Sequence, residues 1–284
     1  MTDRDFDSSA IDRLPPLRDV IAEYGLRAEK SLGQNFLLDG NITDKIARSA
    51  TLQNGETVVE IGPGPGGLTR SLLRLPIAKL YAIEMDPRCI LALARVVDAS
   101  GGRMALQHGD AMKIDYNILT GGQPFHIVAN LPYNVATPLL LNWLSIIRNY
   151  PGLIASMTLM FQKEVADRIM AAPDNKSYGR LSVMAGWLCD IHKCLDLPPT
   201  AFTPAPKVYS AVIRLRPKTL DAATQPSFAT MEKLVAQAFS QRRKMIRGPL
   251  KDYTAQLQDM GVDMTLRAEN LGIPTFIELA RHIS

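Results

Sequence analysis

The chain has few cysteines and no long apolar run, and both features limit the class of protein that it can be. Only three cysteines occur in 284 residues, at positions 89, 189 and 194. Such a sparse, odd set does not suit a disulfide-stabilised secreted domain. No stretch reaches the roughly 18 uninterrupted apolar residues of a membrane-spanning helix. The first twelve residues are acidic and polar, unlike the apolar segment of a secretory leader. We therefore expect a reduced, cytoplasmic protein with no membrane segment.

Net charge is also low, at +4, but it is unevenly distributed along the chain. Residues 202–284 hold 12 Lys and Arg against 7 Asp and Glu, whereas residues 1–201 hold 20 against 21. The densest cluster consists of Arg242, Arg243, Lys244, Arg247 and Lys251. A solvated helix face is the ordinary alternative for such a cluster. The asymmetry between the two parts favours a polyanionic partner, because excess Lys and Arg neutralise phosphates.

Hydrophobic residues make up 46% of the sequence, which is ordinary for a globular protein, and they recur in short runs. The candidate strands are Val58–Gly62, Leu80–Met85, Met104–Gly109, His126–Asn130, Ser156–Phe161 and Ser210–Leu215. Helical patterns fall between them, including Leu68–Leu75, Arg88–Val97 and Thr137–Ile147. This alternation predicts an α/β fold with a doubly wound, mostly parallel sheet.

The two ends of the chain differ from this central pattern. Residues 1–30 indicate an extension with a short helix over Leu17–Tyr24, followed by a turn. Pro217 ends the last candidate strand, and helical patterns follow at Phe228–Ser240, Gly248–Met260, Leu266–Leu271 and Ile273–His282. We therefore predict two domains, residues 1–217 and a small helical domain over residues 218–284.

A glycine-rich loop follows the first candidate strand. Gly62, Gly64 and Gly67 match the dinucleotide-binding fingerprint literally, and a single match of this kind is weak evidence. Pro63 and Pro65 remove two backbone N–H groups, on which a pyrophosphate would depend. S-adenosylmethionine has no phosphate and loses little by their absence. Glu60, at the end of the strand, would repel a phosphate but suits the cationic amino-acid end of S-adenosylmethionine, directly or through a water.

Two further acidic residues follow later strands of the predicted sheet. Glu84 lies 22 residues beyond Gly62, where it is placed to accept both hydroxyls of a ribose, a role common to dinucleotide enzymes as well. Asp110 follows the third strand and, alone, indicates a turn or a helix N-cap. As the next polar residue at the carboxyl edge of the sheet, it is also a candidate to accept the adenine amine, with Ala111 supplying a backbone donor.

The most informative motif follows the fourth candidate strand and consists of Asn130, Leu131, Pro132 and Tyr133. The Asn130 amide oxygen and a carbonyl of the turn can accept hydrogen bonds from an exocyclic NH2 group, while the Tyr133 ring stacks on the heterocycle that carries it. No residue of the motif is a good base or nucleophile. The electrophile must therefore be strongly activated already, as a sulfonium methyl group is.

Together with further motifs, these residues give the chain a resemblance to the small-subunit ribosomal RNA adenine dimethyltransferases, the KsgA family, from about Leu26 to the C-terminus. The motifs that carry it are Gly33–Leu37, Glu60–Gly64, Gly109–Ala111, Asn130–Tyr133, Gln162–Ala166, Tyr178–Val183, Phe202–Val208 and Gln241–Lys244. The resemblance implies a Rossmann-like class I methyltransferase sheet with a small all-helical C-terminal domain. Tyr209 departs from the family pattern, which usually has an acidic residue there.

The resemblance also implies a set of site residues. The positions expected to bind S-adenosylmethionine are Gln34, Asn35, Leu37, Glu60, Gly62, Gly64, Glu84, Met85, Asp110, Ala111 and Asn130. Tyr133 and Phe202 would hold the two faces of the target base, although core packing is the alternative for each aromatic side chain. Lys207 joins the basic cluster as a predicted RNA contact. The run Cys189–Cys194 offers three ligands without a fourth, so no metal site is expected.

The implied activity is transfer of methyl groups to N6 of two adjacent adenosines near the 3′ end of small-subunit ribosomal RNA, in a monomer that binds the assembling small ribosomal subunit. A large-subunit adenine methyltransferase is one alternative. A DNA adenine or protein glutamine methyltransferase is less compatible with Asn130–Tyr133, because it would typically have two prolines between the first residue and the tyrosine. The non-enzymatic alternative is an assembly or nucleic-acid-binding factor.

Overall fold

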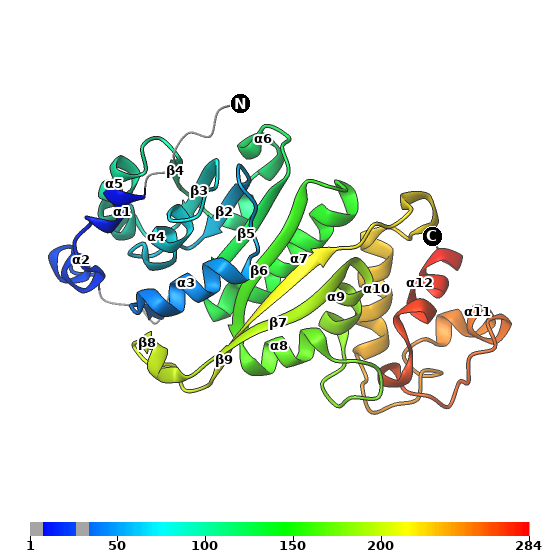
Figure 1. The fold of residues 1–284 in the computed structure, drawn as a ribbon. Coiled ribbons are helices and arrows are strands. Elements are labelled where there is room, and N and C mark those ends of the chain that lie inside the picture. The colour runs from blue at the N-terminus through cyan, green and yellow to red at the C-terminus, as the bar shows by residue number, and fades with distance from the viewer. Residues whose placement is uncertain (1–7, 27–33, 284) are drawn as a thin grey trace.

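The computed structural model describes residues 8–26 and 34–283, in which a seven-stranded sheet forms the centre of the molecule (Figure 1). Its strands are β2 (Thr57–Ile61), β3 (Lys79–Glu84), β4 (Met104–His108), β5 (Phe125–Asn130), β6 (Ile154–Gln162), β7 (Cys189–Leu197) and β9 (Ser210–Pro217). The strand order is β4-β3-β2-β5-β6-β9-β7. The five strands from β4 to β6 in this order are parallel to one another, and β9 runs antiparallel to both of its neighbours, β6 and β7.

This topology places a switch point between β2 and β5. The chain proceeds from β2 outward to β3 and β4, and then returns to pair β5 with the other side of β2. Open α/β sheets bind ligands outside the carboxyl ends of the strands at such a point. The predicted doubly wound, mostly parallel sheet is confirmed.

Two apolar cores lie on opposite faces of the sheet because side chains alternate along each strand. Val58 of β2 belongs to the core that α3 (Gly40–Ser49), α4 (Gly67–Leu73) and α5 (Pro87–Ala99) cover. Val59 belongs to the core covered by α7 (Tyr133–Asn149) and α9 (Arg180–Leu188). The remaining helices before the C-terminal segment are α6 (Tyr116–Thr120) and α8 (Lys163–Met170).

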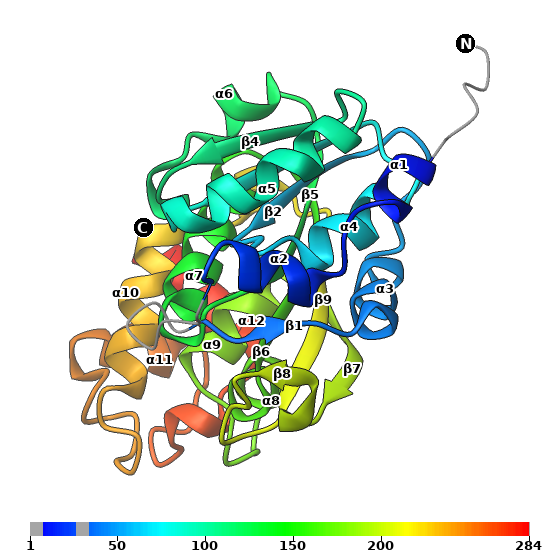
Figure 2. The same cartoon turned by 90° about the vertical axis from the view of Figure 1, so that its left-hand side faces the viewer.

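The N-terminal segment lies against the face that carries α4 and α5 (Figure 2). It contains α1 (Ser9–Asp12) and α2 (Leu17–Glu23), close to the predicted helix Leu17–Tyr24. Arg95 of α5 makes two hydrogen bonds to Glu23, at 2.8 and 2.6 Å, and holds α2 in place. The predicted turn at residues 24–30 lies largely outside the described residues, as does Gly33.

A second, two-stranded sheet joins distant parts of the sequence. Strand β1 (Phe36–Leu37) pairs antiparallel with β8 (Phe202–Thr203), so that Leu37 lies opposite Phe202. Figure 2 shows the two strands side by side. The segment predicted to bind the cofactor is therefore fixed by the segment that precedes β9.

The C-terminal segment contains α10 (Phe228–Phe239), α11 (Thr254–Asp259) and α12 (Ile273–His282). Helix α10 packs against α7 and α9, and the second core extends without a break into the segment. The division into domains at residue 217 stays a prediction. No helix within residues 8–26 and 34–283 is both long and apolar enough to cross a membrane.

Three sequence predictions need correction. The predicted helix Gly248–Met260 was too long, because turns occupy residues 247–250 and α11 begins only at Thr254, after the 3-10 turn Lys251–Tyr253. The predicted helix Leu266–Leu271 is only the 3-10 turn Ala268–Asn270, since the backbone of Met245 bridges to Arg267 and keeps this part extended. Strand β7 was absent from the candidate strands, although the run Cys189–Cys194 is strand-like, because a register shift between Lys193 and Leu195 interrupts its alternation.

Candidate functional site

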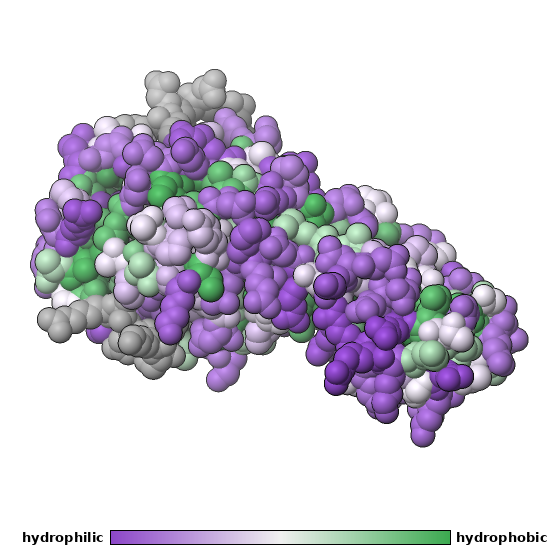
Figure 3. All heavy atoms as spheres, turned by 90° about the horizontal axis from the view of Figure 1, so that it is seen from below, coloured by the Kyte–Doolittle hydropathy of each residue, from purple (hydrophilic) through white to green (hydrophobic). Residues whose placement is uncertain are grey.

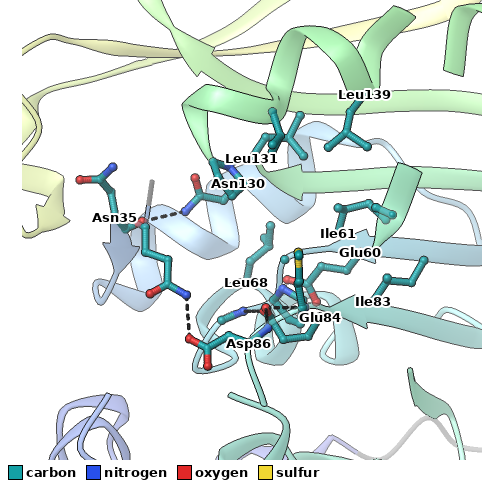
Figure 4. A pocket seen from close by; sticks show the side chains of 18 of the residues that line it. Asn35, Glu60, Ile61, Leu68, Ile83, Glu84, Asp86, Asn130, Leu131 and Leu139 are labelled. Carbon is teal, nitrogen blue, oxygen red and sulfur yellow. Dashed lines mark hydrogen bonds between the residues drawn. The ribbon is translucent and has the colours of Figure 1, made fainter. Parts of the chain in front are cut away.

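A cavity of about 360 Å³ opens at the carboxyl edge of the sheet, across the switch point between β2 and β5. Residues of five segments line it: Gln34–Leu37, Glu60–Pro65 with Gly67 and Leu68, Ile83–Asp86, Gly109–Met112, and Asn130–Val135 with Leu139. Every residue predicted to bind the cofactor is among them. Figure 4 labels four of these residues, Asn35, Glu60, Glu84 and Asn130. The topology has brought together five motifs that lie far apart in the sequence.

The glycine loop is shaped by backbone conformation and by close contacts. Gly64 has a φ of 56°, in the left-handed region, and a Cβ atom there would lie 3.2 Å from the Phe36 ring. A Cβ atom on Gly67 would lie 2.7 Å from the Leu37 carbonyl oxygen. Glycine at these positions lets β1 approach the loop and close one side of the cavity.

Glu84 ends β3, and its buried carboxylate organises the centre of the site. Oε2 accepts the Gly64 N–H at 2.9 Å, while Oε1 accepts the N–H groups of Met85 and Asp86, each at 2.8 Å. Burial raises the pKa of Glu84, and these three hydrogen bonds oppose the rise. A carboxylate has about four acceptor positions, so about one is left for a ligand hydroxyl.

Asp86 connects the N-terminal segment to this site. Its carboxylate accepts hydrogen bonds from Gln34 Nε2 at 3.0 Å and from the Arg88 guanidinium, the shorter at 2.7 Å. The Arg88 side chain, more than any other group, lowers the pKa of Asp86 to about 2. Gln34 is thus held at the cavity wall. Asp86 was not among the predicted site residues, although an acidic residue just before Pro87 is a typical helix N-cap.

Glu60 is the second buried carboxyl group of the cavity, and it is 1% exposed. Its Oε2 atom has no hydrogen-bond partner among the described residues. Burial raises the pKa of Glu60 to about 8; the Thr69 hydroxyl opposes this rise and the charge of Glu84 adds to it. An unpartnered buried acceptor is costly, and a cationic ligand group would satisfy it.

The turn after β5 narrows the choice of atoms that could hold an amine. Asn130 Nδ2 donates to the Asn35 carbonyl at 3.2 Å, which leaves its amide oxygen on the other side (Figure 4). The Pro132 carbonyl accepts the N–H groups of Val135 and Ala136, both at 3.1 Å, in the first turn of α7. Of the carbonyls in this turn, that of Leu131 is therefore a better candidate than that of Pro132 to accept an amine together with the Asn130 oxygen.

The two predicted stacking residues differ in their surroundings. Tyr133 lines the cavity, and its hydroxyl is 2.7 Å from Ser210 Oγ on β9, so the ring is anchored at its far end. Phe202 is 4% exposed, packs in the core beside α3 and α4, and does not line the cavity. Its role as the opposing face stays a prediction.

Asp110 has the position that both of its predicted roles require, and its contact with the adenine amine stays a prediction. It lines the cavity, and its Oδ1 accepts the Met112 N–H at 2.9 Å as the cap of a 3-10 turn. Met85 and Met112 are 61% and 43% exposed at the cavity wall. The sequence analysis missed Met112, as well as the apolar wall formed by Phe36, Ile61, Leu68, Ile83 and Leu139, because helix and strand patterns explain such residues equally well.

The basic cluster divides into two kinds of residue. Arg242 donates to Glu269 Oε2 at 3.2 Å, to the Tyr178 carbonyl at 2.9 Å and to the Lys176 carbonyl. The other cations are exposed and form no ion pair with a described residue: Arg243, Lys244, Arg247, Lys251 and the more distant Lys207. Figure 3 shows strongly hydrophilic surface gathered over the C-terminal part of the molecule. Arg242 thus has structural contacts and its RNA contact stays a prediction, while the other cations remain available to a partner.

The chemistry of the cavity fits S-adenosylmethionine better than a dinucleotide. The loop lacks the N–H groups of Pro63 and Pro65, and two buried carboxyl groups, Glu60 and Glu84, would face a pyrophosphate. The unpartnered oxygen of Glu60 suits an ammonium group, and the free acceptor position of Glu84 suits a ribose hydroxyl.

Comparison with known proteins supports the same conclusion. The family model described as ribosomal RNA adenine dimethylase matches residues 25–284. The chain is 51% identical over 276 residues to a ribosomal RNA small subunit methyltransferase A of Xanthobacter autotrophicus, covering 96% of this chain and 95% of that protein. It is 50% identical over 275 residues to the protein of the same name from Agrobacterium fabrum, covering 96% and 99%.

Solved structures show the same architecture. A dimethyladenosine transferase from Plasmodium falciparum has a TM-score of 0.69 at 25% identity, covering 85% of this chain and 94% of that one. The 23S rRNA methyltransferase ErmE has a TM-score of 0.64 at 25% identity, covering 87% and 98%. The predicted class I methyltransferase fold is confirmed.

The family match also confirms the enzyme class and the methyl donor. The chain is a methyltransferase, and S-adenosylmethionine is its cofactor. The resemblance found in the sequence is therefore correct, and the chain belongs to the ribosomal RNA adenine dimethylase family.

Proposed function

We propose that this enzyme transfers methyl groups to N6 of two adjacent adenosines near the 3′ end of small-subunit ribosomal RNA, giving dimethyladenosine during subunit assembly. The observation that carries the proposal is the turn after β5. There the Asn130 amide oxygen and the Leu131 carbonyl, neither with a described partner, lie next to the Tyr133 ring, which Ser210 anchors. All three residues line the cavity that fits the cofactor.

The chain's own residues supply positioning rather than acid–base chemistry. The N6 atom of adenine is a poor nucleophile, because its lone pair is delocalised into the ring. Hydrogen bonds from N6–H to Asn130 Oδ1 and the Leu131 carbonyl would favour a pyramidal nitrogen whose lone pair points into the cavity. Orientation of this kind contributes about 7–11 kcal/mol in favourable cases. When bound, S-adenosylmethionine supplies the activated methyl group.

The remaining residues of the turn orient the base. Tyr133 is fixed by Ser210, so its ring is pre-organised to stack on the target adenine. Stacking on an aromatic ring is worth roughly 1–3 kcal/mol per base. No tuned base is required, since the methylated nitrogen is strongly acidic and loses its proton to solvent.

The predicted assignments complete the proposal. The cofactor would be held by Gln34, Asn35, Leu37, Glu60, Gly62, Gly64, Glu84, Met85, Asp110 and Ala111, all at the cavity. Residues 218–284 would bind the small ribosomal subunit through their exposed cations, and the enzyme would act as a cytoplasmic monomer.

The decisive experiment incubates the enzyme with methyl-labelled S-adenosylmethionine and small subunits from a strain that lacks this modification. Nucleoside analysis should find labelled dimethyladenosine in the small-subunit RNA. Large subunits whose ribosomal RNA carries no adenine methylation serve as the matched control. Label in large-subunit RNA alone would favour the large-subunit alternative. The 23S rRNA methyltransferase ErmE, whose fold is similar to that of this chain, is named for that activity. Absence of label from both, with donor binding intact, would favour a binding factor.

A further inference from the structure

The exposed segment immediately before β9 contains one predicted RNA contact, Lys207, and two side chains to which no function is assigned. Lys207 is exposed, and Val208 and Tyr209 are 43% and 55% exposed. The next residue, Ser210, is completely buried. A charged, an apolar and an aromatic side chain thus stand in solvent at the point where the chain enters the sheet.

The backbone of Tyr209 is fixed close to the substrate end of the cavity. Its carbonyl accepts the Lys163 N–H at 2.8 Å, which extends the pairing of β6 with β9 by one step. The neighbouring Ser210 Oγ is 2.7 Å from the hydroxyl of Tyr133, which lines the cavity. Consecutive Cα atoms are about 3.8 Å apart, so Tyr209 is one residue away from the anchor of the proposed stacking ring.

The direction of β9 indicates the face on which Tyr209 lies. Ala211 and Ile213 belong to the core that α7, α9 and the C-terminal helices cover. Residues at alternate positions of a strand share a face, so position 209 continues this row at the edge of the sheet. In the strand order, β9 lies beyond β5 and β6, on the side of the cavity where α10 to α12 lie (Figure 1).

We infer that the Tyr209 ring is a stacking platform for the nucleobase beside the target adenosine. The inference rests on the proposed function. An RNA strand that enters the cavity and also contacts the basic C-terminal surface would pass this edge, because β9 lies on the side of β5 toward the C-terminal helices (Figure 1). A base next to an extruded adenosine has lost a stacking partner, and an exposed aromatic ring replaces that partner. Lys207, two residues away, supplies a cation for the adjoining phosphate.

The test compares Tyr209→Ala with Tyr209→Phe. Tyr150→Ala is the matched control, because Tyr150 is also 55% exposed. It lies just before the start of β6, whereas Tyr209 pairs with the residue that follows the end of β6. The readouts are KM for undermethylated small subunits, Kd for S-adenosylmethionine and the melting temperature. Tyr209→Ala should raise KM about 5- to 160-fold, the range for loss of one base stack, with an unchanged donor Kd and melting temperature. Tyr209→Phe and Tyr150→Ala should stay within about twofold of the wild type.

The inference is overturned if Tyr209→Ala keeps the wild-type KM, or if Tyr209→Phe is impaired as strongly as Tyr209→Ala. Failure of the proposed function would be recognised separately, because the wild type itself would then leave small subunits unmodified. In that case the same variants are compared for binding of a single-stranded, adenine-containing oligoribonucleotide by fluorescence anisotropy. Weaker binding of Tyr209→Ala alone supports the platform, and equal binding of all variants rejects it.

Discussion

At the residue scale, Asn130 combines one observed contact with one proposed contact. Its NH2 group donates to the Asn35 carbonyl, and its oxygen is the proposed acceptor of the adenine amine. We predict that Asn130→Ala lowers kcat by about 10²–10³, the usual effect of losing one pre-organised hydrogen bond to a reacting group. Donor binding, measured by calorimetry, should weaken but remain detectable, since many other residues line the cavity.

Asn149→Ala is the control for this substitution, because Asn149 is an exposed asparagine at the end of α7 that is farther from the turn after β5. Its single-turnover rate should equal that of the wild type. A rate for Asn130→Ala within a few-fold of the wild type would remove Asn130 from the amine-holding role.

Glu60 gives the donor-free protein a predictable dependence on pH. Burial raises the pKa of Glu60 from 4.5 to about 8, so between these values the folded protein keeps a proton that the unfolded chain releases. The free energy of unfolding therefore falls as pH rises through this window, by at most about 1.4 kcal/mol per pH unit. The free energy of unfolding, measured by urea denaturation, should therefore shift in favour of Glu60→Gln. Its difference from the wild-type value should grow by on the order of 1–2 kcal/mol from about pH 6 to about pH 8.

Glu278→Gln, at an exposed position of α12, should change with pH as the wild type does. If Glu60→Gln also parallels the wild type across this window, the Glu60 carboxyl group does not keep its proton in the folded state.

Chain order alone placed several of the candidate cofactor residues at the cavity, because they lie at or just after the ends of parallel strands. Glu84 and Asp110 could be placed at one edge from chain order alone. The partners of these side chains could not be predicted. The three N–H groups on Glu84, the Asn35 carbonyl on Asn130 and the Ser210 hydroxyl on Tyr133 depend on loop conformations and on packing between distant segments.

At the element scale, the pairing of β1 with β8 shows why a linear motif can hide its function. Phe36 and Leu37 gave no local signal of a strand, and the resemblance alone marked this segment as part of the site. Its conformation comes from residues 202–203, more than 160 positions later in the sequence. A two-residue strand is too short for a periodic pattern, so only the tertiary structure reveals it.

Arg242 connects two other elements, the loop between α8 and α9 and the C-terminal segment. Its guanidinium bonds the carbonyls of Lys176 and Tyr178 together with Glu269. The ion pair itself contributes little, since the arginine side chain is 43% exposed. We predict that Arg242→Ala lowers the free energy of unfolding by about 1–2 kcal/mol through the lost carbonyl bonds. Amide hydrogen exchange should also accelerate in residues 172–178.

The adjacent exposed Arg243 provides the comparison. Arg243→Ala should leave the free energy of unfolding within about 0.5 kcal/mol of the wild type, because its side chain has no hydrogen bond or ion pair with a described residue. Equal stability of the two variants would mean that the Arg242 contacts do not hold the loop.

At the scale of the whole molecule, positive charge and catalytic cavity lie on different parts of the structure. The cavity opens over β2 and β5, while the densest cluster of cations, within residues 242–251, lies in the C-terminal segment. Chain order predicted this separation, since charge could be counted along the sequence. The continuous core between the sheet and the C-terminal helices could not be predicted, because it depends on the packing of α10 against α7 and α9.

The separation leads to a prediction about salt dependence. Replacing Arg243, Lys244, Arg247 and Lys251 with alanine should weaken binding to small subunits and flatten the plot of log affinity against log salt concentration. Each lost phosphate contact lowers the slope by about 0.7–0.9, so the total change should approach 3. The methyl-transfer rate at saturating substrate should stay near that of the wild type, because these residues are not at the cavity.

The control carries the same change in net charge at exposed cations outside the cluster, with Lys45, Arg48, Lys193 and Lys233 replaced. If long-range attraction by net charge governed binding, both quadruple variants would lose affinity equally. If the C-terminal cluster contacts phosphates directly, only the first variant should change the slope strongly, because counterion release requires contact. Equal slopes in the two variants would therefore contradict a localised RNA-binding surface and favour general electrostatic attraction over the whole molecule.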